Sequence, residues 1–328
     1  MSVPRLSLQR GVAVVTALLL TTLAVTIVAS LFWQQQVQVR SMENQRLHLQ
    51  TRWILRGALD WARLILRQDG LDSQGRGTVT LNGVWATPLA ETRLDQYVER
   101  ERLQNESYDA SLSGQIQDAQ SRYNLINLAD KSMPGQKKQE ELQMFTQLLV
   151  NLQMNPSLAP LIADYVAQSQ SFTGTPNQPL SGSNNGEEPM PLTRVEDLLA
   201  VKGIDANTVE KLREFVIVLP VQTPLNVNTA PAELLAALMP NTSVGEAKAW
   251  VEFRKRSAFN LKSDFDTYLT TAAPGKAPPK TQYDVKSTYF LVQSRILLDR
   301  AALNAQTLIQ RADAVHGWRA SVVWTREY

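Results

Sequence analysis

The chain has 328 residues, of which 44% are hydrophobic, and a formal net charge of +2. This length allows one large core or two modest ones, and so small a net charge does not by itself indicate a nucleic-acid or membrane-surface partner. The sequence has no cysteine and only two histidines, His48 and His316, far apart in the chain. Disulfides and cysteine-based nucleophiles or metal sites are thereby excluded, and a histidine cluster is not favoured. We therefore expect a protein that is not an enzyme and binds no cofactor.

An uncharged apolar segment follows the basic N-terminus. Residues 12–33 contain no charged side chain, and about 20 apolar residues suffice to cross the hydrocarbon core of a bilayer. Arg5 and Arg10 precede the segment, and positive residues on the leading side favour a cytoplasmic N-terminus. We expect residues 12–33 to span the membrane once. The residues alone leave two alternatives open, a secretory signal peptide cleaved near Val28–Ser30 and an ordinary signal anchor.

A helical pattern continues without a break through residues 34–68. Four apolar residues recur there at helical spacing, namely Ile54, Ala58, Trp61 and Ile65. They predict one apolar stripe on an otherwise polar rod. Residues 12–68 as one helix would be about 85 Å long. We expect its first half to be a membrane anchor and its second half the spine of a globular domain, with Trp53 and Trp61 packed in the core.

After a glycine-rich break at residues 69–77 the hydrophobic period changes. Alternating patterns typical of strands occur in residues 110–130 and again near the end of the chain. The three segments at the end, 287–299, 302–312 and 318–328, indicate an antiparallel meander. Residues 131–283 between these β parts have helix start signals, such as Thr229 followed by Pro231. We expect an α+β fold in which a small antiparallel β domain is interrupted by an all-α insertion.

The leader has a recognisable form. A short basic segment ending in Gly11 and followed at once by an apolar helix resembles the type III signal of type IV pilins and pseudopilins. The resemblance implies that prepilin peptidase cleaves between Gly11 and Val12 and methylates the new N-terminus at Val12. Most members carry glutamate at the fifth mature position, where this chain has Thr16. Absence of that glutamate is typical of the K-type minor pseudopilins of type II secretion, so Thr16 is a marker of position in the filament.

Three further segments extend the resemblance along the chain. "SRYNLINL" (121–128), "LNVNTAPAELLAALMP" (225–240) and "YFLVQSRI" (289–296) occur in the order seen in general secretion pathway protein K. The resemblance implies a minor pseudopilin at the tip of the periplasmic pseudopilus, together with I- and J-type subunits, that supports export of folded proteins across the outer membrane. H-type and major pseudopilins and the prepilin peptidase are further candidate partners.

The resemblance also implies a location and a division of the chain. The protein would cross the inner membrane of a Gram-negative bacterium once, with a cytoplasmic N-terminus and a periplasmic globular part. The expected parts are a leader peptide (1–11), a transmembrane segment (12–33), a pseudopilin domain (12–130 and 284–328) and a helical insertion that resembles SAM-like domains (131–283). The insertion would make the tip too broad for a further subunit above it.

Residues 225–240 also resemble helix-hairpin-helix DNA-binding domains of competence proteins, which leaves a membrane-anchored DNA-binding protein as the alternative. Such hairpins bind phosphate through glycine-rich turns at helix N-termini, but the corresponding turn here, "PNTSVG", keeps only Gly245. Between residues 191 and 283 there are 11 Lys or Arg against 10 Asp or Glu, an excess of one. A duplex-binding surface needs a clear basic excess, so we expect no nucleic-acid partner.

K-type subunits often carry a D-x-D segment suited to calcium, which prefers carboxylate oxygens. The corresponding stretch here, "ADYVAQSQS", keeps Asp164 but places Ala167 and Ser169 at the later acidic positions. Glu187 and Glu188 lie far down a loop rich in Ser, Gly, Pro and Asn. We therefore predict no family-type calcium site and no other metal site.

Overall fold

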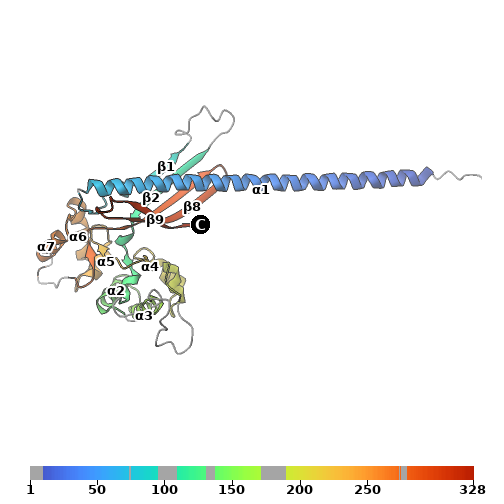
Figure 1. Cartoon of the computed structure of the whole chain (residues 1–328). Helices are drawn as coiled ribbons and strands as arrows, with labels where there is room; N and C mark the ends of the chain where they lie inside the picture. The colour runs from blue at the N-terminus through green and yellow to red at the C-terminus, as the bar shows by residue number, and fades with distance from the viewer. Residues whose placement is uncertain are drawn as a thin grey trace, which may run out of the picture.

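One helix dominates the computed structural model, which describes residues 10–73, 75–94, 109–130, 137–170, 190–272, 274 and 279–328. Helix α1 (Arg10–Asp72) has 63 residues and is therefore about 95 Å long. Its first half projects as a rod beyond the rest of the molecule (Figure 1), and every side chain from residue 12 to residue 46 is exposed. The expectation of one continuous helix from the apolar segment into the globular part is confirmed.

The second half of α1 lies on an antiparallel sheet. The strands are β1 (Leu89–Arg93), β2 (Ala110–Asp118), β7 (Tyr289–Leu298), β8 (Ala301–Arg311) and β9 (Ala320–Glu327), in the spatial order β1-β2-β7-β8-β9. All four pairings are antiparallel. The meander expected at the end of the chain is thus β7–β8–β9, and β1 and β2 extend it on the β7 side.

The face of α1 that covers the sheet differs by one residue from the expected stripe. Its buried side chains, Leu55, Leu59, Ala62 and Leu66, pack with Phe290, Val292 and Ile296 of β7. Three residues of the expected stripe, Ile54, Ala58 and Ile65, lie half-buried beside this face. Trp53 and Trp61 were expected in the core, and this is wrong, because their exposed fractions are 66% and 49%. The helix carries apolar residues on two faces, and spacing alone does not say which of them meets the sheet.

Between β2 and β7 the chain forms a helical region. Its helices are α2 (Gln139–Asn151), α3 (Leu158–Gln170), α4 (Ala206–Leu212), α5 (Ala232–Leu238), α6 (Val244–Arg256) and α7 (Lys262–Ala272). Short 3-10 helices occur in it at Ala119–Ser121, Leu125–Leu128 and Val195–Ala200, and another, Val84–Ala86, lies between α1 and β1. Two parallel strand pairs complete it, β3 (Tyr123–Asn124) with β4 (Val216–Ile217) and β5 (Leu225–Asn226) with β6 (Tyr283–Asp284).

The core of this region reaches past the residues expected to bound it. Tyr123, Leu125 and Leu128 on one side and Val285 on the other belong to the same buried cluster as Phe145 of α2. The expected loop between α3 and residue 190 falls mostly outside the described residues. The division of the chain into domains therefore remains a prediction.

The sheet lies between α1 and the helical region (Figure 1). The face of the sheet turned away from α1 contributes Tyr289, Leu291 and Leu308 to a small cluster with Ile217 and Leu219. Because successive side chains of a strand point to opposite faces, β7 serves both contacts, with Phe290 toward α1 and Leu291 toward the helical region.

A buried arginine holds the end of α1 against the sheet. The Arg311 side chain on β8 is 1% exposed and lies 2.7 Å from a carboxylate oxygen of Asp69. It also donates to the Leu66 carbonyl at 3.2 Å and lies over the rings of Phe290 and Trp318. Trp318 in turn covers Gly70 and Gly77, where a Cβ would come within 2.7 Å and 2.6 Å of its ring.

We expect Arg311→Ala to lower the free energy of unfolding by about 3–5 kcal/mol, because it leaves the Asp69 carboxylate partly buried without its partner. The matched control is Arg300→Ala, which removes an exposed ion pair with Glu43 and should cost less than about 1 kcal/mol. Urea unfolding in detergent micelles, followed by circular dichroism, measures both values. Equal losses in the two variants would contradict the role assigned to Arg311.

Candidate functional site

The first candidate site is the apolar start of α1. Gly11 and Val12 are the second and third residues of the helix, and the leader before Arg10 lies outside the described residues. The Thr16 hydroxyl donates to the carbonyl oxygens of Val12 and Ala13, both at 3.0 Å. Thr21, Thr22 and Thr26 bond in the same way to carbonyls three residues earlier. The threonines are thus satisfied within the helix, as an apolar surrounding requires.

A second candidate surface is the face of α1 opposite the sheet. Five apolar side chains on it are 50% or more exposed, namely Met42, Leu49, Trp53, Leu64 and Leu71. Their spacings of seven, four, eleven and seven residues are whole numbers of helical turns, so they form one line. We call this line the outer stripe of α1. Charged residues interrupt this line, since Asp60 lies between Trp53 and Leu64 and Arg56 lies over the Trp53 ring at 4.9 Å. Exposed apolar side chains gathered on one helix face nevertheless mark an interaction site more often than scattered ones do.

The helical region joins the sheet through a buried carboxylate. Asp118, the last residue of β2, is 3% exposed. Its Oδ2 accepts from Thr229 at 2.6 Å, Ser287 at 2.7 Å and Asn226 at 2.8 Å, and its Oδ1 accepts from the Gln120 amide at 2.8 Å. Burial raises the pKa of this carboxyl, and the four hydrogen bonds oppose the rise. Three separate segments of the chain, residues 118–120, residues 226–229 and Ser287, therefore meet at this side chain.

Sequence reasoning did not identify this junction. Thr229 was interpreted with Pro231 as a helix start, and α5 does begin just after Pro231. The Thr229 hydroxyl, however, donates a hydrogen bond to Asp118, which is 111 residues earlier in the chain. The one local signal was an acidic residue at the end of an alternating strand, and that pattern is also typical of solvent-exposed strand ends.

The N-terminus of α6 does not resemble a phosphate site. Ser243 and Glu246 cap it reciprocally, since Ser243 Oγ accepts from the Glu246 amide at 3.2 Å and the Glu246 carboxylate accepts from the Ser243 amide at 2.8 Å. Two of the amide groups at this helix start are thus engaged within the chain, one by the Glu246 carboxylate and one by the Ser243 hydroxyl, and the negative charge of Glu246 would also repel an anion.

Two residues of the basic run in the last turn of α6 make contacts within the chain. Arg254 is buried and donates to the Val227 carbonyl at 2.6 Å, and burial lowers its pKa to about 10. Lys255 lies 2.6 Å from Glu252. Two of the three residues that could have contacted a duplex are therefore committed elsewhere, which argues against the DNA-binding alternative.

Asp164 has a cationic partner of its own. Its carboxylate lies 2.8 Å from Lys137 Nζ. Within the described ranges no three His, Cys, Asp or Glu side chains gather in a way that could hold a metal ion, and Glu187 and Glu188 lie outside those ranges. His316 contacts Asp313 at 2.6 Å on the surface. The absence of a calcium site stays a prediction.

Comparison with known proteins gives a consistent result. Family models described as type II secretion system protein K match residues 121–221 and 225–286. A protein named type II secretion system protein K from Pseudomonas aeruginosa is 30% identical over 319 residues, covering 93% of this chain and 90% of that protein. Its namesake from Klebsiella pneumoniae is 24% identical, covering 94% of each.

The fold has a solved counterpart. A chain of the crystal structure of the GspK-GspI-GspJ complex from enterotoxigenic Escherichia coli superposes with a TM-score of 0.64 at 20% identity. The superposition covers 88% of this chain and 99% of that one. The expected α+β class, with a long N-terminal helix, an antiparallel sheet and additional helices, is confirmed.

The junction at Asp118 predicts a pH dependence. In the folded protein its pKa lies above the ordinary 3.8, so the fold binds this proton more tightly than the unfolded chain does. Its contribution to stability is therefore full below about pH 4 and falls as the pH rises through the raised pKa. We expect the free energy of unfolding of the wild type, relative to Asp118→Asn, to decrease as the pH is raised above about 4 in urea titrations.

In the matched control, Asp205→Asn, the change of stability with pH has the opposite sign. The Thr208 amide and hydroxyl lower the pKa of Asp205, which caps α4, and asparagine caps helices about as well as aspartate. The stability of the wild type relative to Asp205→Asn should therefore fall as the pH drops below about 4. Parallel pH profiles for the two variants would contradict the assignment of the raised pKa to Asp118.

Proposed function

This chain belongs to the type II secretion system protein K family, and we propose on that basis that it is the minor pseudopilin at the tip of a periplasmic pseudopilus. In that position it would be assembled with I- and J-type subunits and support export of folded proteins across the outer membrane. The observation that carries the proposal is the 30% identical relative, which is matched over 90% of its length. We propose a structural role without catalysis, since the relatives are named as components of a secretion system.

We further propose that α1 anchors the chain once in the inner membrane, with the N-terminus in the cytoplasm and the globular part in the periplasm. In the part of the chain that the structure describes, α1 is the one helix whose length and composition suit a membrane span, and none of its apolar window is buried. Arg5 and Arg10 before the uncharged residues 12–33 support the cytoplasmic side of the N-terminus.

Processing between Gly11 and Val12 and methylation of Val12 belong to the same proposal. Thr16 supports a terminal place in the filament. Its hydroxyl bonds to carbonyls of its own helix, and it has no carboxylate to attract the N-terminal amine of a neighbouring subunit. A subunit that lacks this carboxylate does not depend on that contact with a neighbouring subunit, as a terminal position in the filament would allow.

The outer stripe of α1 is the surface that we propose for the I- and J-type helices. The similar Escherichia coli chain was solved in a GspK-GspI-GspJ complex, and the outer stripe is the apolar side of the same helix that the sheet leaves uncovered. Trp61 borders it, at the mouth of an apolar groove of about 230 Å³ between α1 and β1–β2. The exposed apolar residues 12–33 precede the stripe on the same helix, and Figure 1 shows the course of that helix into the globular part.

We propose that the helical region forms a separate part from Tyr123 to Val285, since the buried cluster of the region spans these residues. It lies beside the C-terminal end of α1, far from the membrane half (Figure 1). Its bulk at that end supports the idea that it leaves no room for a further subunit above.

The processing proposal is tested by the mass of the mature N-terminus after expression with a prepilin peptidase. We expect the chain to begin with methylated Val12, and Gly11→Leu to keep its leader, because a bulky residue does not fit the extended form needed at a protease site. Gly57→Leu is the control, since Gly57 has nothing within 4 Å of a Cβ and the variant should be processed normally. An intact Met1 or a start after Ser30 in the wild type would overturn this proposal.

The partner surface is tested by co-purification with I- and J-type subunits from detergent extracts. We expect Trp53→Glu combined with Leu64→Glu to reduce recovery of the partners at least tenfold, because two charges would be buried in an apolar contact. Leu81→Glu, at an exposed apolar residue outside α1, should leave recovery unchanged. Both sets of residues are exposed, so an unchanged melting temperature confirms intact folding. Equal recovery would place the interface elsewhere.

A further inference from the structure

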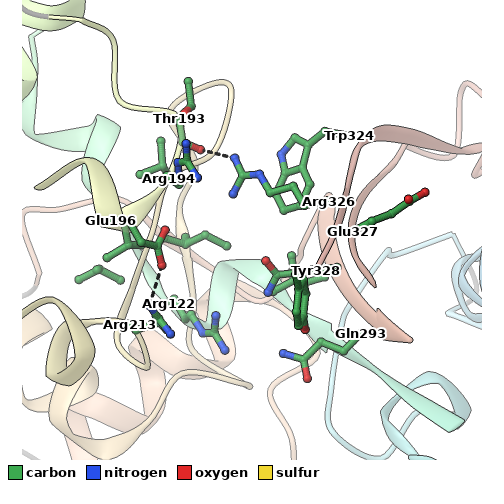
Figure 2. Close-up of a pocket in the computed structure, with 16 residues that line it drawn as sticks. Arg122, Thr193, Arg194, Glu196, Arg213, Gln293, Trp324, Arg326, Glu327 and Tyr328 are labelled. Carbon is green, nitrogen blue, oxygen red and sulfur yellow. Dashed lines mark hydrogen bonds and ion pairs between the residues drawn. The ribbon is translucent and has the colours of Figure 1, made fainter. Parts of the chain in front are cut away.

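A cleft of about 810 Å³ opens between the sheet face turned away from α1 and the start of the helical region (Figure 2). Strands β7, β8 and β9 form one wall, and residues 193–196 with β4 form the other. Its volume is typical of ligand pockets, which measure about 300–1,000 Å³. Four arginines line it, namely Arg122, Arg194, Arg213 and Arg326.

Two of these arginines have carboxylate partners. Arg213 lies 2.9 Å from Glu196, and Arg194 lies 3.2 Å from Asp197. The other acidic side chain at the cleft, Glu327, is bonded to Arg52 of α1 at 2.9 Å and points away from the arginines in Figure 2. Among the described residues, Arg122 and Arg326 have no carboxylate within ion-pair distance.

Arg122 and Arg326 are nevertheless held in place. Arg122 donates to the Gln117 side-chain carbonyl at 2.9 Å. Arg326 donates to the Thr193 carbonyl at 2.8 Å and lies 4.1 Å over the ring of Trp324. Burial lowers the pKa of both. Glu214 opposes this shift at Arg122. At Arg326 the charge of Arg194 adds to the shift, and the carboxylates of Glu196 and Asp197 oppose it. Neither of these partly dehydrated guanidinium groups is in direct contact with a carboxylate of the described residues, so each has donors left for an anion.

The rest of the lining suits a polypeptide better than a compact anion. The side-chain amides of Gln293 and Gln306 face the cleft from neighbouring strands, and an amide can both donate to and accept from a peptide backbone. Leu291, Val218 and Trp324 supply apolar surface between the charged groups. A free phosphate would use none of this apolar surface.

We propose that this cleft binds an extended acidic segment of another protein, with two of its carboxylates on Arg122 and Arg326. Guanidinium forks match carboxylates bidentately, and clusters of arginine are a recurrent means of recognising acidic motifs. This role goes beyond the place in the pseudopilus proposed above, because it concerns a face of the sheet that neither α1 nor its outer stripe uses.

The test uses the full chain in detergent micelles and a fluorescein-labelled hexapeptide that alternates glutamate with alanine. Fluorescence anisotropy should show saturable binding that weakens as salt is raised. We expect Arg122→Gln combined with Arg326→Gln to weaken binding at least tenfold. Arg256→Gln, which removes the same charge from an exposed position at the end of α6, should leave the affinity unchanged.

Further variants and competitors distinguish bidentate recognition of carboxylates from simple charge attraction and from binding of phosphate or lipid. Arg122→Lys combined with Arg326→Lys keeps the two positive charges but loses the bidentate guanidinium groups. This variant should bind the peptide with an affinity between those of the wild type and the glutamine variant. An unchanged circular dichroism spectrum guards against loss of folding. The proposal is overturned if the glutamine variant binds as the wild type does, if a hexapeptide with glutamine in place of glutamate binds equally well, or if equimolar inorganic phosphate or phosphatidylglycerol vesicles displace the peptide.

Discussion

The position of the globular part depends on one buried ion pair. Arg311 on β8 meets Asp69 near the end of α1, and the rings of Phe290 and Trp318 close over the guanidinium. A buried charge of this kind is tolerated only with its partner and its hydrogen bonds in place. It therefore fixes the helix end at one height along the sheet, whereas the apolar contacts of Leu55, Leu59 and Leu66 would tolerate a shift by one turn.

A second polar contact fixes the helical region on the other side of the sheet. Asp118 gathers hydroxyl and amide groups from residues 226, 229 and 287 at the end of β2. Apolar contacts such as Leu291 with Ile217 bring the two parts together, and the directional bonds at Asp118 determine their orientation. The two walls of the cleft that holds Arg122 are also joined directly, since Arg326 of β9 donates to the Thr193 carbonyl at 2.8 Å.

Local patterns in the sequence were sufficient to predict α1, the β7–β8–β9 meander and the helical region. Each of these has a regular hydrophobic period or clear signals at its ends. They did not show which face of α1 meets the sheet, because Trp53 and Leu55 both lie on apolar faces and the choice is made by the sheet. Nor did they reveal Asp118 or the arginine cleft, which combine residues more than 70 positions apart. Such sites depend on tertiary structure.

The continuity of α1 has a mechanical consequence. No proline interrupts it between residues 12 and 72, and helices bend sharply only where proline, paired small residues or inserted groups break their hydrogen bonds. Helix α1, which is about 95 Å long, is therefore expected to be rigid from its apolar end to Asp69. A force along the helix axis would therefore be transmitted to the sheet through the apolar packing of Leu55, Leu59 and Leu66 and through the Arg311–Asp69 ion pair at the helix end.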